Sequence, residues 1–225
     1  MLTPSIDSYR DIINAPNCLF LPVTARNTEQ YGRILLTKNC KNVIAANGGI
    51  MYINGQKSKE WDEIISKITA TETNNYSYFM NVLQDYTHII ESGPRLVDNT
   101  VIFAKFKDVP SEQTEPIKTL LSETKKVNWD ITIQGKKIYV APEKISKEDA
   151  LAFFLSKIPD QHIVTAGDGM MDVNFINMGH TRFIPENSEA YHKVQNKTMY
   201  HIVPQGPEGT YEMLTHIKNL IKKEE

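Results

Sequence analysis

The sequence at residues 162–172 is His-Ile-Val-Thr-Ala-Gly-Asp-Gly-Met-Met-Asp, and this stretch decides the fold. Its apolar first half predicts a buried strand, and Gly167-Asp168-Gly169 predicts the turn that follows. Ligands bind at the carboxyl ends of the strands in open α/β sheets. Asp168 and Asp172 could therefore share one Mg²⁺, which takes few protein carboxylates together with waters and phosphate oxygens. The alternative is a plain turn with an aspartate that caps the next helix.

The same alternation of helices and buried strands extends to both sides of this stretch. Continuous apolar runs predict strands, and apolar residues at helical spacing predict helices. The expected elements outside the middle of the chain are a helix over 5–13, a strand over 18–24, a helix from a capping box at 27–30 through 34–36, a strand over 42–46, a helix capped by Ser146, strands at 162–166, 182–185 and 200–203, and a last helix from about 210. This order predicts an α/β domain with a parallel sheet.

The middle of the chain has a different texture. Helices are expected around 61–68, 73–83 and 115–122, and strands over 100–106, 129–133 and 137–140, with a hairpin turn at Gln134-Gly135-Lys136. This pattern predicts an α+β insert with an antiparallel sheet. We therefore expect a core domain over 1–54 and 143–225 and a cap domain over 55–142.

Three further positions are candidates for phosphate binding. Thr24 ends the first expected strand and is followed by Ala25 and Arg26; a hydroxyl there, with free amides at the next helix N-terminus, suits a phosphate. Lys147 starts a helix, where the dipole disfavours a cation unless an anion is bound. Asn47, in Asn47-Gly48-Gly49, could line a pocket. Taken singly, the alternatives are a strand-ending threonine, a solvated lysine and an ordinary turn.

Composition narrows the function classes. A formal charge of −2 gives no general attraction to nucleic acid or anionic membranes, and no apolar stretch approaches the ~20 residues of a membrane span. Cys18 and Cys40 have no CxxC partner, so neither a disulfide framework nor a zinc site is expected. We expect a cytoplasmic protein without a signal peptide. The sequence leaves the oligomeric state open.

Taken in order, these residues resemble the haloacid dehalogenase (HAD) phosphohydrolases, in the Cof-type and sucrose-phosphate-phosphatase-like branch. Leu21-Pro22-Val23-Thr24-Ala25-Arg26 is similar to the second motif of that branch, whose hydroxyl holds the phosphoryl group. Residues 44–49 resemble its Asn-Gly segment, and Lys147 stands where the lysine of the third motif is expected. Residues 167–172 resemble the fourth motif, whose aspartates serve the magnesium site. The implied fold is a HAD-like Rossmannoid parallel-sheet core with an inserted α+β cap domain.

The sequence departs from the family pattern in two places. Met171 stands where the branch usually has an asparagine. The Asp-X-Asp motif, which supplies the nucleophile and the general acid, has no counterpart, because Asp7 and Asp11 have the wrong spacing and lie on an expected helix. We expect the missing strand to precede the present start and to lie between the strands that end at Thr24 and Ala166. A truncated or mis-started product is favoured over an evolved pseudoenzyme. Alternatively, the neighbouring strands close up, or another chain supplies a strand.

The resemblance implies a Mg²⁺-dependent phosphatase for a small phosphorylated metabolite such as a sugar phosphate, acting through an aspartyl-phosphate. Thr24 and Lys147 are the implied catalytic residues; Thr24, Ala25, Arg26, Asn47 and Lys147 bind the substrate, and Asp168 and Asp172 bind the metal. The alternative is a catalytically inactive phosphate-binding or regulatory protein. A chance match in a generic α/β domain is a third interpretation.

Overall fold

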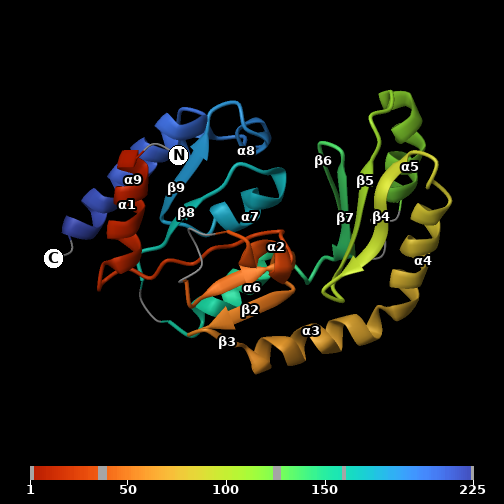
Figure 1. The fold of residues 1–225 in the computed structure, drawn as a ribbon, viewed down its shortest axis with the longest axis horizontal. Helices are drawn as coiled ribbons and strands as arrows, with labels where there is room; N and C mark the ends of the chain where they lie inside the picture. The colour runs from red at the N-terminus through yellow and green to blue at the C-terminus, as the bar shows by residue number, and fades with distance from the viewer. Residues whose placement is uncertain (1–2, 35–39, 124–127, 159–160, 224–225) are drawn as a thin grey trace. The chain divides into compact units, whose positions relative to one another are not determined.

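The structure is a computed structural model that describes residues 3–34, 40–123, 128–158 and 161–223 (Figure 1). Its contacts divide the chain into two compact units. Unit 1 comprises residues 1–22 and 154–225, and unit 2 comprises residues 23–153. The predicted boundaries between core and cap, at 54/55 and 142/143, differ from the boundaries of these two units and stay a prediction.

Unit 1 contains a parallel sheet, as the α/β pattern predicts. Its order is β10-β9-β8, formed by β8 (Val164–Ala166), β9 (Thr181–Pro185) and β10 (His201–Val203). The remaining elements of the unit are α1 (Thr3–Asn14), α7 (Val173–Ile176), α8 (Glu189–Lys193), α9 (Gly206–Lys223) and two short 3₁₀ turns at Met170–Asp172 and Lys197–Met199. Among the described residues no strand pairs with the outer side of β8, so the loop after it lies at a sheet edge.

The helices of unit 1 form an apolar cluster of their own. Tyr9 and Ile12 of α1 pack with Leu214 of α9, which confirms the two amphipathic helices predicted at the ends of the sequence. Cys18 and Phe20 pack against the same cluster, and the Phe20 ring meets Tyr9 edge-on with centroids 5.3 Å apart.

The predicted buried strand over 18–24 is wrong. Only Val23 is in a β-bridge, parallel to Ile44, and Leu19 is half exposed. A strand buried on both faces needs hydrogen-bonding neighbours on both sides. Here the apolar side chains of Cys18 and Phe20 pack instead on the pair of helices α1 and α9.

Unit 2 begins with a short helix and a hairpin. Asn27 caps α2 (Thr28–Gly32) in the predicted capping box with Gln30, and the rest of that expected helix, at residues 35 and 36, lies outside the described residues. The predicted strand over 42–46 is present as β1 (Val43–Ala45). It pairs antiparallel with β2 (Ile50–Ile53), which pairs in turn with β3 (Gln56–Lys57). The strands β2 and β3 were not predicted.

The middle of the chain forms the antiparallel sheet that the sequence predicts. Its order is β4-β5-β7-β6, from β4 (Ile90–Val97), β5 (Val101–Phe106), β6 (Trp129–Gln134) and β7 (Lys137–Pro142). Side chains of α4 (Thr73–Gln84) and α5 (Ser111–Glu123) cover one face, with Phe79, Ile117 and Trp129 buried between helices and sheet (Figure 1). The helix predicted around 61–68 is present as α3 (Lys59–Thr71), which leads into this region and is capped by Ser58.

The strand β4 was not predicted. Its sequence, Ile-Glu-Ser-Gly-Pro-Arg-Leu-Val, lacks regular alternation, because the Gly-Pro pair interrupts it. The pairing of β4 with β5 shifts register twice, between Ile90 and Ser92 and between Ser92 and Arg95. With these shifts, both ends of β4 remain paired with β5.

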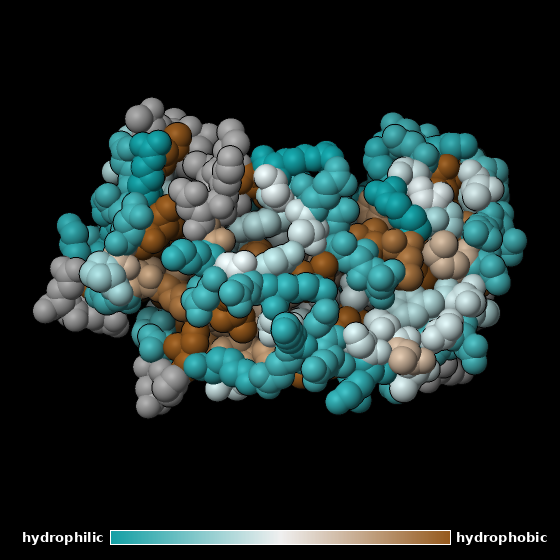
Figure 2. Space-filling view, turned by 60° about the horizontal axis from the view of Figure 1, so that its bottom comes forward, coloured by the Kyte–Doolittle hydropathy of each residue, from teal (hydrophilic) through white to brown (hydrophobic). Residues whose placement is uncertain are grey.

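The last element of unit 2 is the predicted helix α6 (Lys147–Leu155), which continues past the boundary of the unit. No described helix is both long enough and apolar enough to cross a membrane, and hydrophilic residues make up most of the face drawn in Figure 2. Both cysteines are free thiols.

Candidate functional site

Thr24 and Asn47 lie side by side in unit 2. The Thr24 amide donates to the carbonyl of Ile44 at 2.9 Å, and the Asn47 amide donates to the carbonyl of Thr24 at 3.1 Å. The Thr24 hydroxyl oxygen accepts a hydrogen bond from the amide of Arg26 at 3.1 Å, which leaves the hydroxyl proton available as a donor. The end of the 18–24 segment is thereby fixed against the loop after β1.

The Asn47 side chain is a buried polar group. It is 7% exposed, with backbone angles φ 54° and ψ 32° in the left-handed region that asparagine tolerates. Its buried Oδ1 makes no hydrogen bond with any described residue. Buried polar atoms of this kind are rare in native proteins, and an amide oxygen takes a hydrogen bond only from a donor.

Gly48 brings this loop against the start of α6. Its φ is +101°, and a Cβ atom at this residue would lie 2.1 Å from the carbonyl oxygen of Ser146 and 3.3 Å from the amide nitrogen of Lys147. The Gly48 carbonyl accepts a hydrogen bond of 2.8 Å from the Trp61 indole. The Asn-Gly turn is therefore fixed in contact with the backbone that precedes Lys147.

Lys147 is the first residue of α6 and is only 6% exposed. Ser146 caps the helix, as predicted: its Oγ accepts from the amide of Asp149 at 3.1 Å and donates to the carboxylate of Asp149 at 2.7 Å. Lys147 is unusually buried for a lysine. Its location, where helix amides already favour an anion, is suited to a phosphate.

The structure thus brings the backbone positions of Thr24, Asn47 and Lys147 into one continuous set of contacts. Ala25 and Arg26 belong to the turn between Thr24 and α2, and the Arg26 carbonyl accepts from the amide of Ala46 at 2.8 Å. The Arg26 side chain is exposed. A hydroxyl, a carboxamide and a buried ammonium are together a donor set for phosphate oxygens.

The two predicted metal ligands lie in unit 1, in the loop after β8. Asp172 is 8% exposed, and its Oδ2 accepts from the amides of Gly169 at 2.8 Å and Asp168 at 3.2 Å. Gly167 abuts the same side chain, because a Cβ atom there would lie 2.6 Å from the Asp172 Cβ. Asp172 therefore organises the loop.

Asp168 has the exposed carboxylate of this pair, while its carbonyl accepts a hydrogen bond of 3.0 Å from the amide of Ala190. The described residues contain no group of three or more His, Cys, Asp or Glu side chains around a common point. Mg²⁺ suits one or two carboxylates with waters and phosphate oxygens, so the donor set fits this ion and not a cation that needs a full protein cage.

The acidic residues near the start of the chain are engaged elsewhere. Asp11 forms an ion pair of 2.7 Å with Lys218 of α9, and Asp7 lies 3.7 Å from Arg10 on the same helix face. Both aspartates are on α1, which confirms that neither follows a strand. Neither therefore has the setting of the family's nucleophile.

The chain resembles known proteins in its structure. No family model and no curated relative matches the sequence. The structure is similar to the sucrose-phosphatase of Synechocystis sp. PCC6803, solved with sucrose and phosphate, with a TM-score of 0.72, 13% identity, and coverage of 95% of this chain and 91% of that one.

Two further solved structures are similar over nearly the whole chain. A haloacid dehalogenase-like hydrolase from B. subtilis has a TM-score of 0.64 at 12% identity and covers 96% of this chain and 93% of its own. A trehalose-6-phosphate phosphatase from Aspergillus fumigatus has a TM-score of 0.55 at 12% identity, with 97% and 84% covered. The fold of this chain is therefore that of the haloacid dehalogenase-like hydrolases, in the form found in sucrose-phosphatase.

Proposed function

We propose that this chain binds the phosphate group of a small phosphorylated metabolite, such as a sugar phosphate, as part of a Mg²⁺-dependent phosphatase. The observation that carries the proposal is the set of backbone contacts that joins Thr24 to the Asn47 turn and that turn to the start of α6, where Lys147 is buried. A phosphate oxygen bound there would accept from the Asn47 amide and the Thr24 hydroxyl. The Lys147 ammonium would neutralise part of its charge.

The proposed metal ligands are Asp168 and Asp172, and Asp172 would also hold the loop through its hydrogen bonds to the backbone. Mg²⁺ bound there would supply charge neutralisation for phosphoryl oxygens. The Asp172 side chain fixes the backbone on both sides of Gly169, so that the Asp168 carboxylate is presented from a rigid loop.

An aspartyl-phosphate mechanism also needs a carboxylate nucleophile and a general acid. Asp7 and Asp11 are the acids nearest to the expected position, and both are occupied on α1. Thr24 and Lys147 would therefore bind and orient the phosphate here, and neither Asp7 nor Asp11 is assigned the attack on phosphorus.

The substrate class rests on the fold. Solved structures of similar fold include a sucrose-phosphatase and a trehalose-6-phosphate phosphatase, both named for small phosphorylated sugars. The antiparallel sheet over β4–β7 corresponds in our proposal to a cap that favours small substrates over macromolecules. The free thiols of Cys18 and Cys40 support a reducing, cytoplasmic setting.

A second candidate function is binding or regulation without catalysis. The observation that favours it is the engagement of Asp7 and Asp11 in ion pairs, which leaves the phosphate-binding residues in place and no nucleophile near them in sequence. Such a protein would keep its affinity for a phosphorylated metabolite and have no turnover.

The discriminating experiment is an assay of p-nitrophenyl phosphate hydrolysis with Mg²⁺, run on the chain and on Asp168→Asn, beside a titration with inorganic phosphate. Hydrolysis that Asp168→Asn abolishes supports the phosphatase. Phosphate binding by folded protein without hydrolysis supports the binding protein. If the folded protein shows no hydrolysis and no phosphate binding, both candidate functions are contradicted.

A further inference from the structure

One face of the antiparallel sheet, opposite the face that α4 and α5 cover, carries aromatic and cationic side chains. Along β5, Ile102 and Ala104 point into the cluster under α4 and α5, so the alternating Phe103 points to the opposite side. The register places Phe103 between Arg95 of β4 and Tyr139 of β7. We call Arg95, Phe103, Lys137 and Tyr139 the cap face.

The two rings of the cap face form an angled, half-buried corner. The ring centroids of Phe103 and Tyr139 are 5.5 Å apart, with an interplanar angle of 62°. The guanidinium carbon of Arg95 lies 4.8 Å from the Phe103 centroid. Tyr139 makes no hydrogen bond with a described residue through its hydroxyl. A corner of this kind can pack against the apolar face of a ring while the hydroxyl binds a polar substituent.

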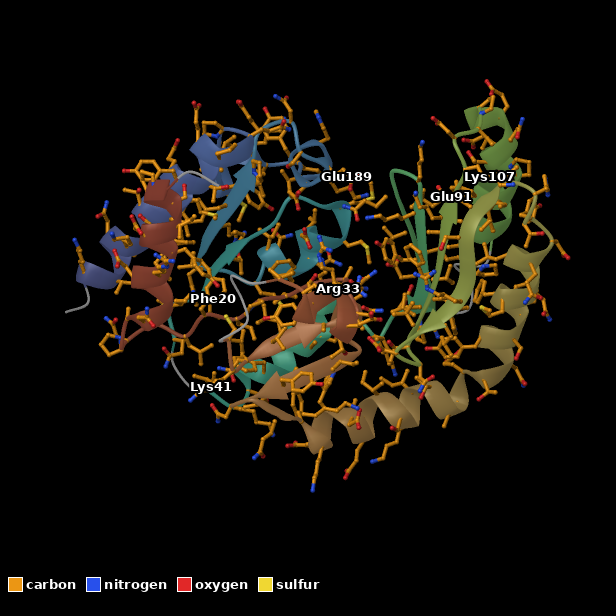
Figure 3. The ribbon with its side chains drawn as sticks, in the orientation of Figure 1. Phe20, Arg33, Lys41, Glu91, Lys107 and Glu189 are labelled. Atoms are coloured by element: carbon orange, nitrogen blue, oxygen red, sulfur yellow. The ribbon has the colours of Figure 1, made fainter. Side chains whose placement is uncertain are left out.

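Two cationic side chains of the cap face are not neutralised by an acid of the described residues. Lys105 is neutralised by Glu91, labelled in Figure 3, at 2.7 Å. Arg95 and Lys137 are exposed, and neither forms an ion pair with a described residue; the Arg95 guanidinium donates only to the Ser92 hydroxyl, at 2.9 Å. Another acid of this sheet is Asp130 on β6, whose carboxylate accepts a hydrogen bond of 3.0 Å from the Thr132 hydroxyl.

Arg26 connects this face with the phosphate-binding residues inside unit 2. Its amide donates to the Thr24 hydroxyl, and its positive charge acts on the Tyr139 phenol. Burial raises the pKa of Tyr139, and the charge of Arg26 opposes that rise. The cap face therefore lies within electrostatic reach of the turn that follows Thr24.

The turn between β4 and β5 is held against the same region. The Asp98 carboxylate accepts a hydrogen bond of 3.4 Å from the Thr28 amide. Gly49 abuts Thr100, because a Cβ atom at Gly49 would lie 2.3 Å from the Thr100 hydroxyl oxygen. These two contacts fix the strands that carry Arg95 and Phe103 relative to Asn47 and α2.

We infer that the cap face selects metabolites in which the phosphorylated compound carries a second anionic group on a ring. The ring packs into the corner of Phe103 and Tyr139, and the second anion binds the planar guanidinium of Arg95 with help from Lys137. This inference rests on the proposed function, since the first phosphate is the one held by Thr24, Asn47 and Lys147. A carboxylate and a second phosphate are the two sources of such an anion.

The test is a calorimetric titration of the full chain with four probes. Inorganic phosphate reports the first site alone, and glucose 6-phosphate adds a ring without a second charge. Glucuronic acid 1-phosphate adds a carboxylate, and fructose 1,6-bisphosphate adds a second phosphate. We expect at least one of the last two probes to bind about tenfold tighter than glucose 6-phosphate, because it gains one charge-assisted contact. The probe that binds tighter identifies whether the second anion is a carboxylate or a phosphate.

Variants separate this inference from the proposed function. Arg95→Gln and Lys137→Gln should remove most of the preference and leave the Kd for inorganic phosphate within about twofold, whereas Lys67→Gln, an equal charge change on α3, should change neither. Equal affinity of wild type for all three ring compounds, or a preference that survives in Arg95→Gln, overturns the inference alone. Absence of binding by every phosphorylated probe overturns the proposed function and the inference together.

Discussion

Asn47 and Thr24 are joined through their backbones, because the amide of Asn47 donates a hydrogen bond of 3.1 Å to the carbonyl oxygen of Thr24. This bond places the buried Asn47 carboxamide next to a hydroxyl at the end of a chain segment. Gly48 then carries the same loop into contact with the backbone before Lys147. Three residues that are far apart in sequence therefore depend on one tight turn.

Replacement of Gly48 tests that turn. Gly48→Ala adds a methyl group 2.1 Å from the Ser146 carbonyl at a φ of +101°, and should lower the free energy of unfolding by about 2–4 kcal/mol. Gly55→Ala is the matched control, because Gly55 also has a positive φ, +80°, with open space around it, and should cost about 1–2 kcal/mol. Urea denaturation measures both; equal losses would contradict the close contact.

Lys147 is predicted to act on phosphate more than on the fold. Lys147→Met should raise the Kd for inorganic phosphate about tenfold or more, because it removes a buried ammonium from the bound anion. Lys144→Met, at an exposed position three residues earlier, should leave the Kd unchanged. Titration calorimetry on both variants decides it, and an unaltered Kd in Lys147→Met would remove this residue from the site.

The two aspartates after β8 are expected to differ in what they support. Asp172→Ala leaves two backbone amides without their acceptor and should lower the free energy of unfolding by about 1–3 kcal/mol. Asp168→Asn changes an exposed carboxylate and should alter stability by less than about 0.5 kcal/mol while weakening Mg²⁺ binding. Thermal unfolding and Mg²⁺ titration together check this; the reverse pattern would exchange the two roles.

The electrostatic link between Arg26 and Tyr139 has a defined sign. A nearby cation stabilises the phenolate, so Arg26→Gln should raise the pKa of Tyr139 further above its ordinary value. The difference in phenolate absorbance between Arg26→Gln and Arg26→Gln/Tyr139→Phe during an alkaline titration isolates this group. A pKa that stays the same or falls would show that Arg26 does not reach the cap face.

The sequence predicted local structure well where local interactions decide it. The capping box of Asn27 with Gln30 and the cap formed by Ser146 both have the expected partners. The strand predicted over 18–24 failed because apolar residues do not specify what they pack on, and Cys18 and Phe20 pack on helices. Pairing with a distant strand is a tertiary property that a run of apolar residues cannot define.

The candidate site was predictable in part for the same reason. Thr24, Asn47 and Lys147 stand in motifs with fixed spacing to strand and helix ends, so the chain itself indicates them. Arg95, Phe103 and Tyr139 are brought together only by the register of three strands, and Arg95 lies in a strand that the Gly-Pro pair concealed. The available signal was the alternation of buried and exposed positions along β5 and β7. It shows which residues share a face of the sheet and does not show which strands lie beside them.

The most direct test of the central claim is a calorimetric titration of the folded chain with inorganic phosphate, repeated on Thr24→Val and Asn47→Leu. Each variant removes the polar group that is proposed to donate to the phosphate. We predict saturable binding to the wild type and a Kd about tenfold or more higher in each variant. Absence of binding to folded wild type, or the same Kd in all three proteins, would contradict the assignment of Thr24 and Asn47 to a phosphate site.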